Sequence, residues 1–180
     1  MTALRTAQLD LEPLSVSHAD EMFALLADAT LYRYIDHPPP PSLEHLRQVY
    51  TRQAVGQSAD GREIWLNWVL RERATGLAVG TVQATVLGDG RAWVAYMLGR
   101  DFWGRGHARA ATAAMVEHLL AHCHCHELMA CVEQDNDRSL HLLACLGFAP
   151  APADHPVRAT LDATEQLCVL AAGAARPAGA

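Results

Sequence analysis

The residues with the clearest chemical potential lie between positions 98 and 111, in the segment LGRDFWGRGHARAA. Gly104 and Gly106 stand where a strand should end and a helix begin, and glycine allows positive φ and close approach to a ligand. The first N–H groups of a helix lack internal partners, and the helix dipole favours an anion beside them. Arg105 and Arg109 add bidentate donors for phosphate. The segment predicts a pyrophosphate cradle; the alternative is a tight turn with solvated arginines.

Other phosphate-binding motifs fit this segment less well. A Walker loop, G-x-x-x-x-G-K-[ST], is absent. A dinucleotide fingerprint, G-x-G-x-x-G, would place Arg109 in the sixth position, where close packing of helix on strand needs a small residue. The segment also follows an antiparallel meander instead of opening a first βαβ unit. A dinucleotide site is therefore disfavoured.

A second unusual stretch, AHCHCHEL at residues 121–128, contains three histidines and two cysteines in five positions. If the helix continued through it, His122 and His126 would share a face and His124 would point away. Structural zinc sites take paired ligands from two separate places, and Cys131 on the next strand is not a second cluster. We expect no bound metal, with a metal-binding regulatory protein as the alternative.

The elements that must position these residues follow from periodicity and caps. Ser17 with Asp20 suggests a capping box, Ser42 and Asn136 or Asp137 are candidate caps, and Asp89-Gly90 predicts a hairpin turn. Helices are expected near residues 17–28, 42–56, 106–121 and 136–147. Strands are expected at residues 6–12, 64–71, 78–87, 92–98, 128–133 and 165–170.

This order predicts an α+β fold, a three-layer arrangement with a mixed, mostly antiparallel central sheet and helices on both faces. We expect one domain over residues 1–170 and a loose tail at 171–180, which is rich in small residues, proline and glycine. Trp65 and Trp68 lie three apart on one strand and must face opposite sides, so at least one should be core.

Composition excludes several classes of protein. The chain has 180 residues, 51% hydrophobic and 19% charged, with a net charge of −6. That charge argues against sequence-independent binding to nucleic acid. The first residues lack the apolar run of a signal peptide, and no segment is long and apolar enough for a membrane span. Five cysteines without a secretory signal suggest reduced thiols and a cytoplasmic protein.

Two motifs carry a resemblance to a known family. YMLGRDFWGRGHARAATAAMVEHLL, followed by LMACVEQDNDRSLHLLACLGF, resembles the GNAT superfamily of acetyl-CoA-dependent N-acetyltransferases. The closer likeness is to the RimJ/RimL-type branch, with its W-G-x-G-[YH]-A turn and its N-x-x-S-x-x-[LV]-x-x-x-G-F ending. The second pattern is met at Asn136, Ser139, Leu142, Gly147 and Phe148. The resemblance covers roughly residues 6–170 and implies the GNAT-like acyl-CoA N-acyltransferase fold.

The resemblance also implies roles for individual residues. Backbone N–H groups of residues 105–109 should hold the pyrophosphate of acetyl-CoA, and the strand before the turn should line the pantetheine arm and polarise the thioester carbonyl. Asn136 is expected beside the pantetheine, and Ser139 near the sulfur. The expected donor-binding residues are Met97, Leu98, Gly99, Trp103, Gly104, Arg105, Gly106, His107, Ala108, Arg109, Asn136 and Ser139.

Such an enzyme lets an amine attack the thioester directly, with backbone donors stabilising the oxyanion. Ser139 is a candidate general acid for the leaving thiolate; its alternative role is a helix cap. Relatives often carry Glu on the strand before the turn, but here Trp93 occupies that place and Ala95 stands where Gly is usual. Glu133 is a weak candidate base, beside Glu63 and His155, and each of the three has the alternative of being a surface residue.

A lysine amine, with a pKa of about 10.4, needs a base far more than an α-amine, with a pKa of about 7.8. The missing carboxylate therefore mildly favours an α-amine acceptor. The acceptor side should lie along the loop after the first helix, where Asp36 is a candidate ammonium partner beside Tyr32, Tyr34 and His37. All four have the alternative of being ordinary loop residues.

The sequence thus predicts an N-acetyltransferase that uses acetyl-CoA and a primary amine, either a protein N-terminal α-amine or a small-molecule amine. No metal, nucleic acid or membrane partner is expected, and relatives suggest a monomer or a homodimer. The replacement of the usual Glu by Trp93 leaves an alternative, a catalytically weak acyl-CoA-binding sensor or regulatory module.

Overall fold

A computed structural model gives the structure, which describes residues 1–173. The sheet has eight strands in the order β1-β2-β3-β4-β5-β6-β8-β7. Only β5 and β6 run parallel to each other; the other neighbours are antiparallel. The strands are β1 (Leu4–Arg5), β2 (Leu9–Pro13), β3 (Glu63–Glu72), β4 (Ala78–Leu87), β5 (Arg91–Leu98), β6 (Glu127–Glu133), β7 (Ala149–Pro150) and β8 (Glu165–Ala171).

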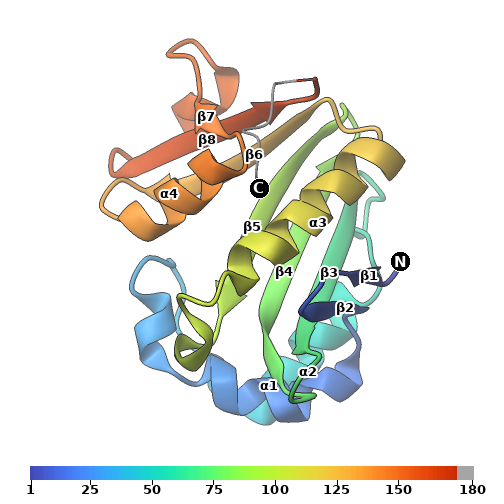
Figure 1. The fold of residues 1–180 in the computed structure, drawn as a ribbon. Coiled ribbons are helices and arrows are strands. Elements are labelled where there is room, and N and C mark those ends of the chain that lie inside the picture. Colours follow the sequence, from blue (N-terminus) through green and yellow to red (C-terminus); the bar gives the residue numbers. More distant parts are fainter. Residues whose placement is uncertain (174–180) are drawn as a thin grey trace.

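Helices cover both faces of this sheet (Figure 1). The α-helices are α1 (Ala19–Leu26), α2 (Leu43–Gln53), α3 (His107–His122) and α4 (Asp137–Cys145). On β3, the buried Trp68 and Leu70 join the core beneath α3, whereas Val69 between them joins the core formed with α1 and α2. Because successive strand residues point to opposite faces, α3 and the pair α1 and α2 lie on opposite sides of the sheet. The predicted three-layer α+β fold is confirmed.

Two local predictions near the N-terminus are wrong. The strand predicted at residues 6–12 begins only at Leu9, because the Thr6 N–H donates to the Leu9 carbonyl at 2.8 Å and forms a turn between β1 and β2. The capping box lies at Ser15, not Ser17: the Ser15 N–H donates to His18 Nδ1 at 3.0 Å. The His18 ring also reaches Glu12 at 3.1 Å, so a contact from a neighbouring strand decides where the turn begins.

Other boundaries agree closely with the sequence. Strand β4 occupies the predicted residues, and the Ser42 hydroxyl caps α2 by accepting from the His45 N–H at 3.1 Å. Trp68 is fully buried, as expected for at least one of the two tryptophans of β3. Strand β8 runs through Ala171, one residue beyond its predicted end, so the expected tail begins later. Residues 174–180 of that tail lie outside the described part of the chain.

The feature that positions the site is the divergence of β5 and β6. Their parallel pairing covers three residue pairs, from Arg91 with Glu127 to Trp93 with Met129. Beyond Trp93 the two strands spread apart, and the N-terminal ends of α3 and α4 lie beside the opening (Figure 1). Backbone groups along the inner edges of both strands are thereby freed from strand pairing.

Candidate active site

The opening between β5 and β6 forms part of a cavity of about 1140 Å³. Its walls come from segments far apart in sequence: the loop between α1 and α2, strands β4 to β6, and the first turns of α3 and α4. The predicted site residues in the wall are Met97, Leu98, Trp103, Ala108, Glu133, Asn136 and Ser139. The remaining predicted donor-binding residues lie outside the wall: Gly99 at the end of β5, and Gly104, Arg105, Gly106, His107 and Arg109 along the adjoining turn and the start of α3.

The end of β5 directs one backbone donor into this opening. The Gly99 N–H donates to the Val79 carbonyl at 2.9 Å, so it is already engaged by β4. In an antiparallel ladder, pairs that exchange hydrogen bonds alternate with pairs that do not. Leu98 pairs with Gly80 in the next position, so its N–H points away from β4, toward the divergent β6. Among the three backbone positions predicted here, Leu98 is therefore the one with a donor directed into the opening.

Gly80 makes this close approach of the two strands possible. A Cβ on Gly80 would lie 2.3 Å from the Met97 carbonyl oxygen and 2.8 Å from Leu98 Cα. Neither backbone atom can yield without moving β5, so a side chain at position 80 would displace the strand that carries the Leu98 N–H.

The turn before α3 has the backbone geometry predicted from its glycines. Gly104 and Gly106 have φ values of 76° and 79°, in the left-handed region, and Gly106 is the N-cap of α3. The Ala110 N–H donates to the Gly106 carbonyl at 3.0 Å. The N–H groups before Ala110 in the first turn therefore have no partner within the helix and can bind an anion.

Charged and aromatic side chains surround this turn. The Arg138 guanidinium, at the start of α4, lies 4.3 Å from the centre of the Trp103 ring, and the Trp103 indole N–H donates to the Leu98 carbonyl at 2.9 Å. Arg105 lies 5.3 Å from the Phe102 ring centre. Arg109 is exposed. The turn thus joins β5, α3 and α4, and its arginines stand near the free N–H groups.

His107 anchors the start of α3 to β3 and is buried, with 3% of its surface exposed. Its Nε2 lies 3.0 Å from Glu72 Oε1, and Glu72 also accepts from the Thr75 hydroxyl at 2.7 Å. The hydrogen bond from Thr75, and then that from His107, lower the pKa of Glu72. His107 was predicted to bind the donor through its backbone N–H, and its side chain instead points to β3, where it contacts Glu72.

Ser139 and Asn136 meet at the N-terminus of α4. Asn136 is the N-cap, since its Oδ1 accepts from the Ser139 N–H at 3.2 Å. The Ser139 side chain is therefore not the cap; its Oγ lies 2.6 Å from the Tyr96 hydroxyl of β5. Burial raises the pKa of Tyr96 to about 12, so this phenol stays protonated at neutral pH. The hydrogen bond spans the opening between β5 and α4.

Sequence reasoning did not single out Tyr96. Its only signal was its position two residues before Leu98, on a strand predicted to border the site. Its partner Ser139 is 43 residues away in the chain, so the contact depends on the divergence of β5 and β6.

The three candidate bases are widely separated. Glu133 is half-buried in the cavity wall, at the end of β6. Glu63 lies outside the wall and accepts from the Trp65 indole N–H at 3.0 Å. His155 is also outside it and contacts Glu127 at 3.2 Å. Of the three, Glu133 alone borders the cavity.

The loop between α1 and α2 forms the other side of the cavity. Tyr32, Tyr34 and His37 line it together with the four prolines at 38–41, whereas Asp36 does not. The Tyr34 hydroxyl donates to the Asp135 carbonyl at 3.3 Å, which connects this loop to the segment between β6 and α4. The position of Asp36 gives no support to its predicted role as the ammonium partner.

The histidine- and cysteine-rich stretch lies away from this cavity. Helix α3 ends at His122, close to its predicted end, and His124 has a left-handed φ of 54°, so the helix does not continue to bring His122 and His126 onto one face. Cys125 is buried in the core. Among residues 1–173, no group of three or more histidine, cysteine, aspartate or glutamate side chains is arranged to hold a metal ion.

Two further expectations concern the state of the cysteines and the presence of a membrane span. Cys123, Cys125, Cys131, Cys145 and Cys168 are all free thiols. Within the same residues, no helix combines the length and the apolar character needed to cross a bilayer.

A mixed sheet with two divergent parallel strands, and a glycine turn that opens a helix beside the divergence, is the arrangement of an N-acyltransferase fold. The model of the family "Acetyltransferase (GNAT) domain" matches residues 8–149. The chain belongs to this family and is an N-acetyltransferase.

Individual relatives agree with this assignment. The chain is 26% identical over 151 residues to "Uncharacterized N-acetyltransferase p20" of Bacillus licheniformis, covering 82% of this chain and 83% of the relative. The structure resembles RimL, a ribosomal L7/L12 α-N-protein acetyltransferase in complex with coenzyme A, with a TM-score of 0.80, 15% identity, and coverage of 97% and 100%. It also resembles a spermidine N-acetyltransferase from Vibrio cholerae in complex with coenzyme A and spermine, with a TM-score of 0.75, 15% identity, and coverage of 94% and 98%. At these identities the two structures establish the fold alone.

Proposed function

We propose that the protein transfers the acetyl group of acetyl-CoA directly to a primary amine in the cavity between β5 and β6, as a member of the RimJ/RimL-type branch. The observation that carries this proposal is the convergence on one cavity of the first turn of α3, the Leu98 N–H and the Ser139 hydroxyl. The fold supports it, since two structures that share the fold contain coenzyme A.

In this proposal, the free N–H groups at the start of α3 bind the pyrophosphate, and Arg105 and Arg109 supply positive charge nearby. The pantetheine arm extends between β5 and β6 past Asn136. The side-chain NH₂ of Asn136 is not used in the helix cap, so it can donate to the arm. The Leu98 N–H donates to the thioester carbonyl and stabilises the oxyanion that develops when the amine attacks. The C–S bond then breaks and releases coenzyme A as a thiolate.

Ser139 donates a proton to that thiolate, and Tyr96 positions Ser139. When Tyr96 donates its hydroxyl hydrogen to Ser139 Oγ, the Ser139 hydrogen is free to point into the cavity. A simple thiol has a pKa of about 8.5, so the thiolate leaves with little help and the acid contributes modestly. Glu133, the one candidate base in the cavity wall, receives the amine proton through water.

The acceptor we favour is an α-amine. About a third of an α-amine is already neutral near pH 7.5, against about one part in a thousand of a lysine amine. Strand β5 carries Trp93 in place of the usual carboxylate, and both Trp93 and Asp36 lie outside the cavity wall, so the cavity suits the amine that needs less help. RimL, named for an α-N-protein activity, is consistent with this choice, whereas the spermidine enzyme represents the small-amine alternative.

Calorimetry with acetyl-CoA, followed by a turnover assay, tests the proposal. We expect micromolar binding that an Arg105→Ala/Arg109→Ala variant weakens by about tenfold. An Arg52→Ala/Arg62→Ala variant changes the net charge equally at exposed positions outside the cavity, and it should bind like the native protein. No binding at millimolar acetyl-CoA would contradict the proposal.

The turnover assay uses peptides with free α-amines, lysine with a blocked α-amine, and polyamines. Release of coenzyme A with the peptides supports an α-amine acceptor. Tight binding without turnover of any amine would instead favour the alternative of an acyl-CoA sensor.

The roles of Ser139 and Tyr96 can be separated from binding. Ser139→Ala should lower kcat by about tenfold with little change in the KM for acetyl-CoA, and Tyr96→Phe should lower it less. Because Tyr96 acts through Ser139, the double variant should be no slower than Ser139→Ala alone. Fully additive losses would show that Tyr96 acts independently of Ser139.

A further inference from the structure

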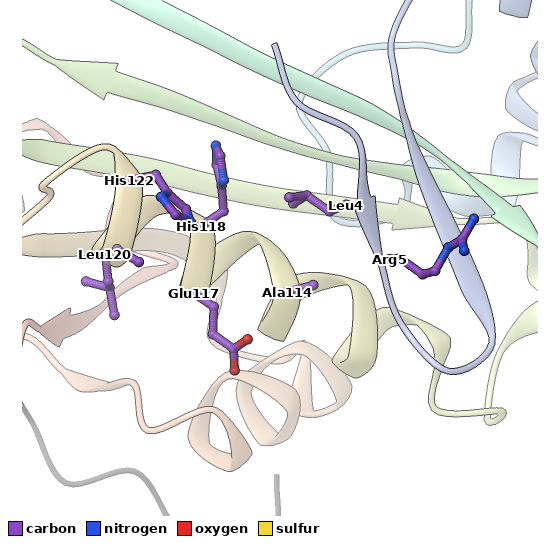
Figure 2. A pocket seen from close by; sticks show the side chains of 8 residues that line it. Leu4, Arg5, Ala114, Glu117, His118, Leu120 and His122 are labelled. Carbon is purple, nitrogen blue, oxygen red and sulfur yellow. The ribbon is translucent and has the colours of Figure 1, made fainter.

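The last turns of α3 carry two imidazoles that the proposed function does not use. His118 and His122 are four residues apart, so they lie on the same face of the helix. They border a shallow groove of about 660 Å³ between α3 and β1, whose wall includes Leu4 and Arg5. Figure 2 shows the two rings close together at the end of α3, with the Arg5 side chain extending away from them.

The spacing of the two rings matches that of two ligands on one metal ion. Their centroids are 5.1 Å apart, and their planes are inclined by 43°. With metal–nitrogen bonds of about 2.1 Å, two imidazoles in a tetrahedral shell have centroids about 5 Å apart. The spacing of the rings therefore fits two ligands of one ion.

His118 is held in place by the core. Its ring meets the fully buried Trp68 edge to face, with centroids 5.8 Å apart and planes at 85°. Trp68 is fixed in turn because its indole N–H donates to the Thr2 carbonyl at 2.9 Å. His122 is exposed and can adjust to an ion. One ordered ligand and one adjustable ligand lower the entropic cost of binding.

The nitrogens of both rings are available to a ligand. In the described part of the chain, neither ring forms a hydrogen bond or an ion pair with a protein group; their contacts are those between aromatic rings. A ring nitrogen with a free lone pair is the group through which histidine binds a metal.

We propose that His118 and His122 bind a divalent first-row transition ion, such as Ni²⁺, Cu²⁺ or Zn²⁺, with water completing the coordination shell. These ions favour imidazole, whereas Mg²⁺ and Ca²⁺ favour oxygen ligands. His118 and His122 lie 11 and 15 residues beyond His107, or about 16 and 22 Å along the helix axis from the start of α3. The ion would thus lie apart from the acetyl-transfer cavity and stabilise the last turns of α3, which carry both ligands.

Calorimetry of tag-free protein with NiCl₂ and with ZnCl₂ tests this proposal, with MgCl₂ as the ionic control. We expect one ion per chain with micromolar affinity for Ni²⁺ and Zn²⁺, and no binding of Mg²⁺. His122→Gln, at an exposed position that should tolerate the change, should weaken binding at least tenfold, and His118→Gln should do the same. The melting temperature should rise with Ni²⁺ in the native protein and stay constant in the His122→Gln variant.

Matched controls separate this pair from the neighbouring cluster. His124→Gln/His126→Gln and His141→Gln remove imidazoles elsewhere and should leave the affinity unchanged. A loss of binding confined to the His124→Gln/His126→Gln variant would overturn the proposal in favour of the 122–126 stretch. Absence of binding at millimolar Ni²⁺ and Zn²⁺ would also overturn it.

Discussion

The two ends of α3 differ in a way that the sequence alone does not make obvious. The N-terminal end has few side chains of catalytic type, yet it opens onto the cavity and presents free backbone N–H groups. The C-terminal end begins a stretch of three histidines and two cysteines in five residues, but the chain leaves the helix after His122, turns at His124 and buries Cys125.

The comparison indicates that the proposed site depends on backbone geometry more than on side-chain type. Gly104 and Gly106 set a conformation that directs several donors to one point, and the helix dipole adds to their effect. Histidine and cysteine side chains at the C-terminal end of α3 must lie on a common face to bind one ion together. The stretch 122–126 has no such common face. His118 and His122, still inside the helix, do share a face.

The largest expected effect is at the N-terminal end, in Gly106→Ala. A Cβ there meets no protein atom within 4 Å, so the cost to folding comes from the positive φ, about 1–2 kcal/mol. The effect on the donor is larger, because the N–H groups shift: we expect the KM for acetyl-CoA to rise by about 10- to 100-fold. Gly61→Ala, with a φ of 70° and equally open space far from the cavity, is the matched control. An equal rise in KM in both variants would contradict the assignment of the cradle.

A smaller effect is expected at Glu72, which contacts His107 beneath the first turn of α3. It should appear in the pH dependence of the melting temperature. The folded-state pKa of Glu72 lies below its ordinary value of 4.5, because Thr75 and His107 bind the carboxylate. Its stabilising contribution is complete above pH 4.5 and is lost as the pH falls through the lower, folded-state value. Melting temperatures measured from pH 7 to pH 3 should fall less steeply in Glu72→Gln than in the native protein. Equal slopes would show that Glu72 does not contribute in this range.

The smallest effect is expected at the C-terminal end, in His124→Gly. Histidine at a φ of 54° is strained, so glycine should stabilise the fold by about 0.5–1 kcal/mol. Because the residue lies outside the cavity wall, kcat and KM should remain within about twofold of the native values. Denaturant unfolding measures the stability, and the acetyl-transfer assay measures kcat and KM. A large loss of activity would show that the C-terminal end of α3 also contributes to the site.

Local sequence determined the parts of this protein in which nearby residues interact. The glycines of the turn, the Ser42 and Asn136 caps, and the extent of β4 depend on propensities and hydrogen bonds within a few residues, so they were predictable. The family resemblance rests on two such local motifs. The same reasoning failed near the N-terminus, where a ring from a later residue moved the capping box to Ser15.

Tertiary structure alone decided which distant residues meet. The hydrogen bond of Tyr96 with Ser139 spans 43 residues, and that of His107 with Glu72 spans 35. The register with β4 directs the Leu98 N–H away from β4, and the divergence of β5 from β6 leaves it unpaired at the cavity. The path of the chain leaves Asp36, Glu63 and His155 outside the cavity wall. The type of a residue and its spacing from other residues indicate what chemistry it can perform. Which groups share a cavity depends on how the whole chain packs, because contacts of large sequence separation form only when the sheet and its helices come together.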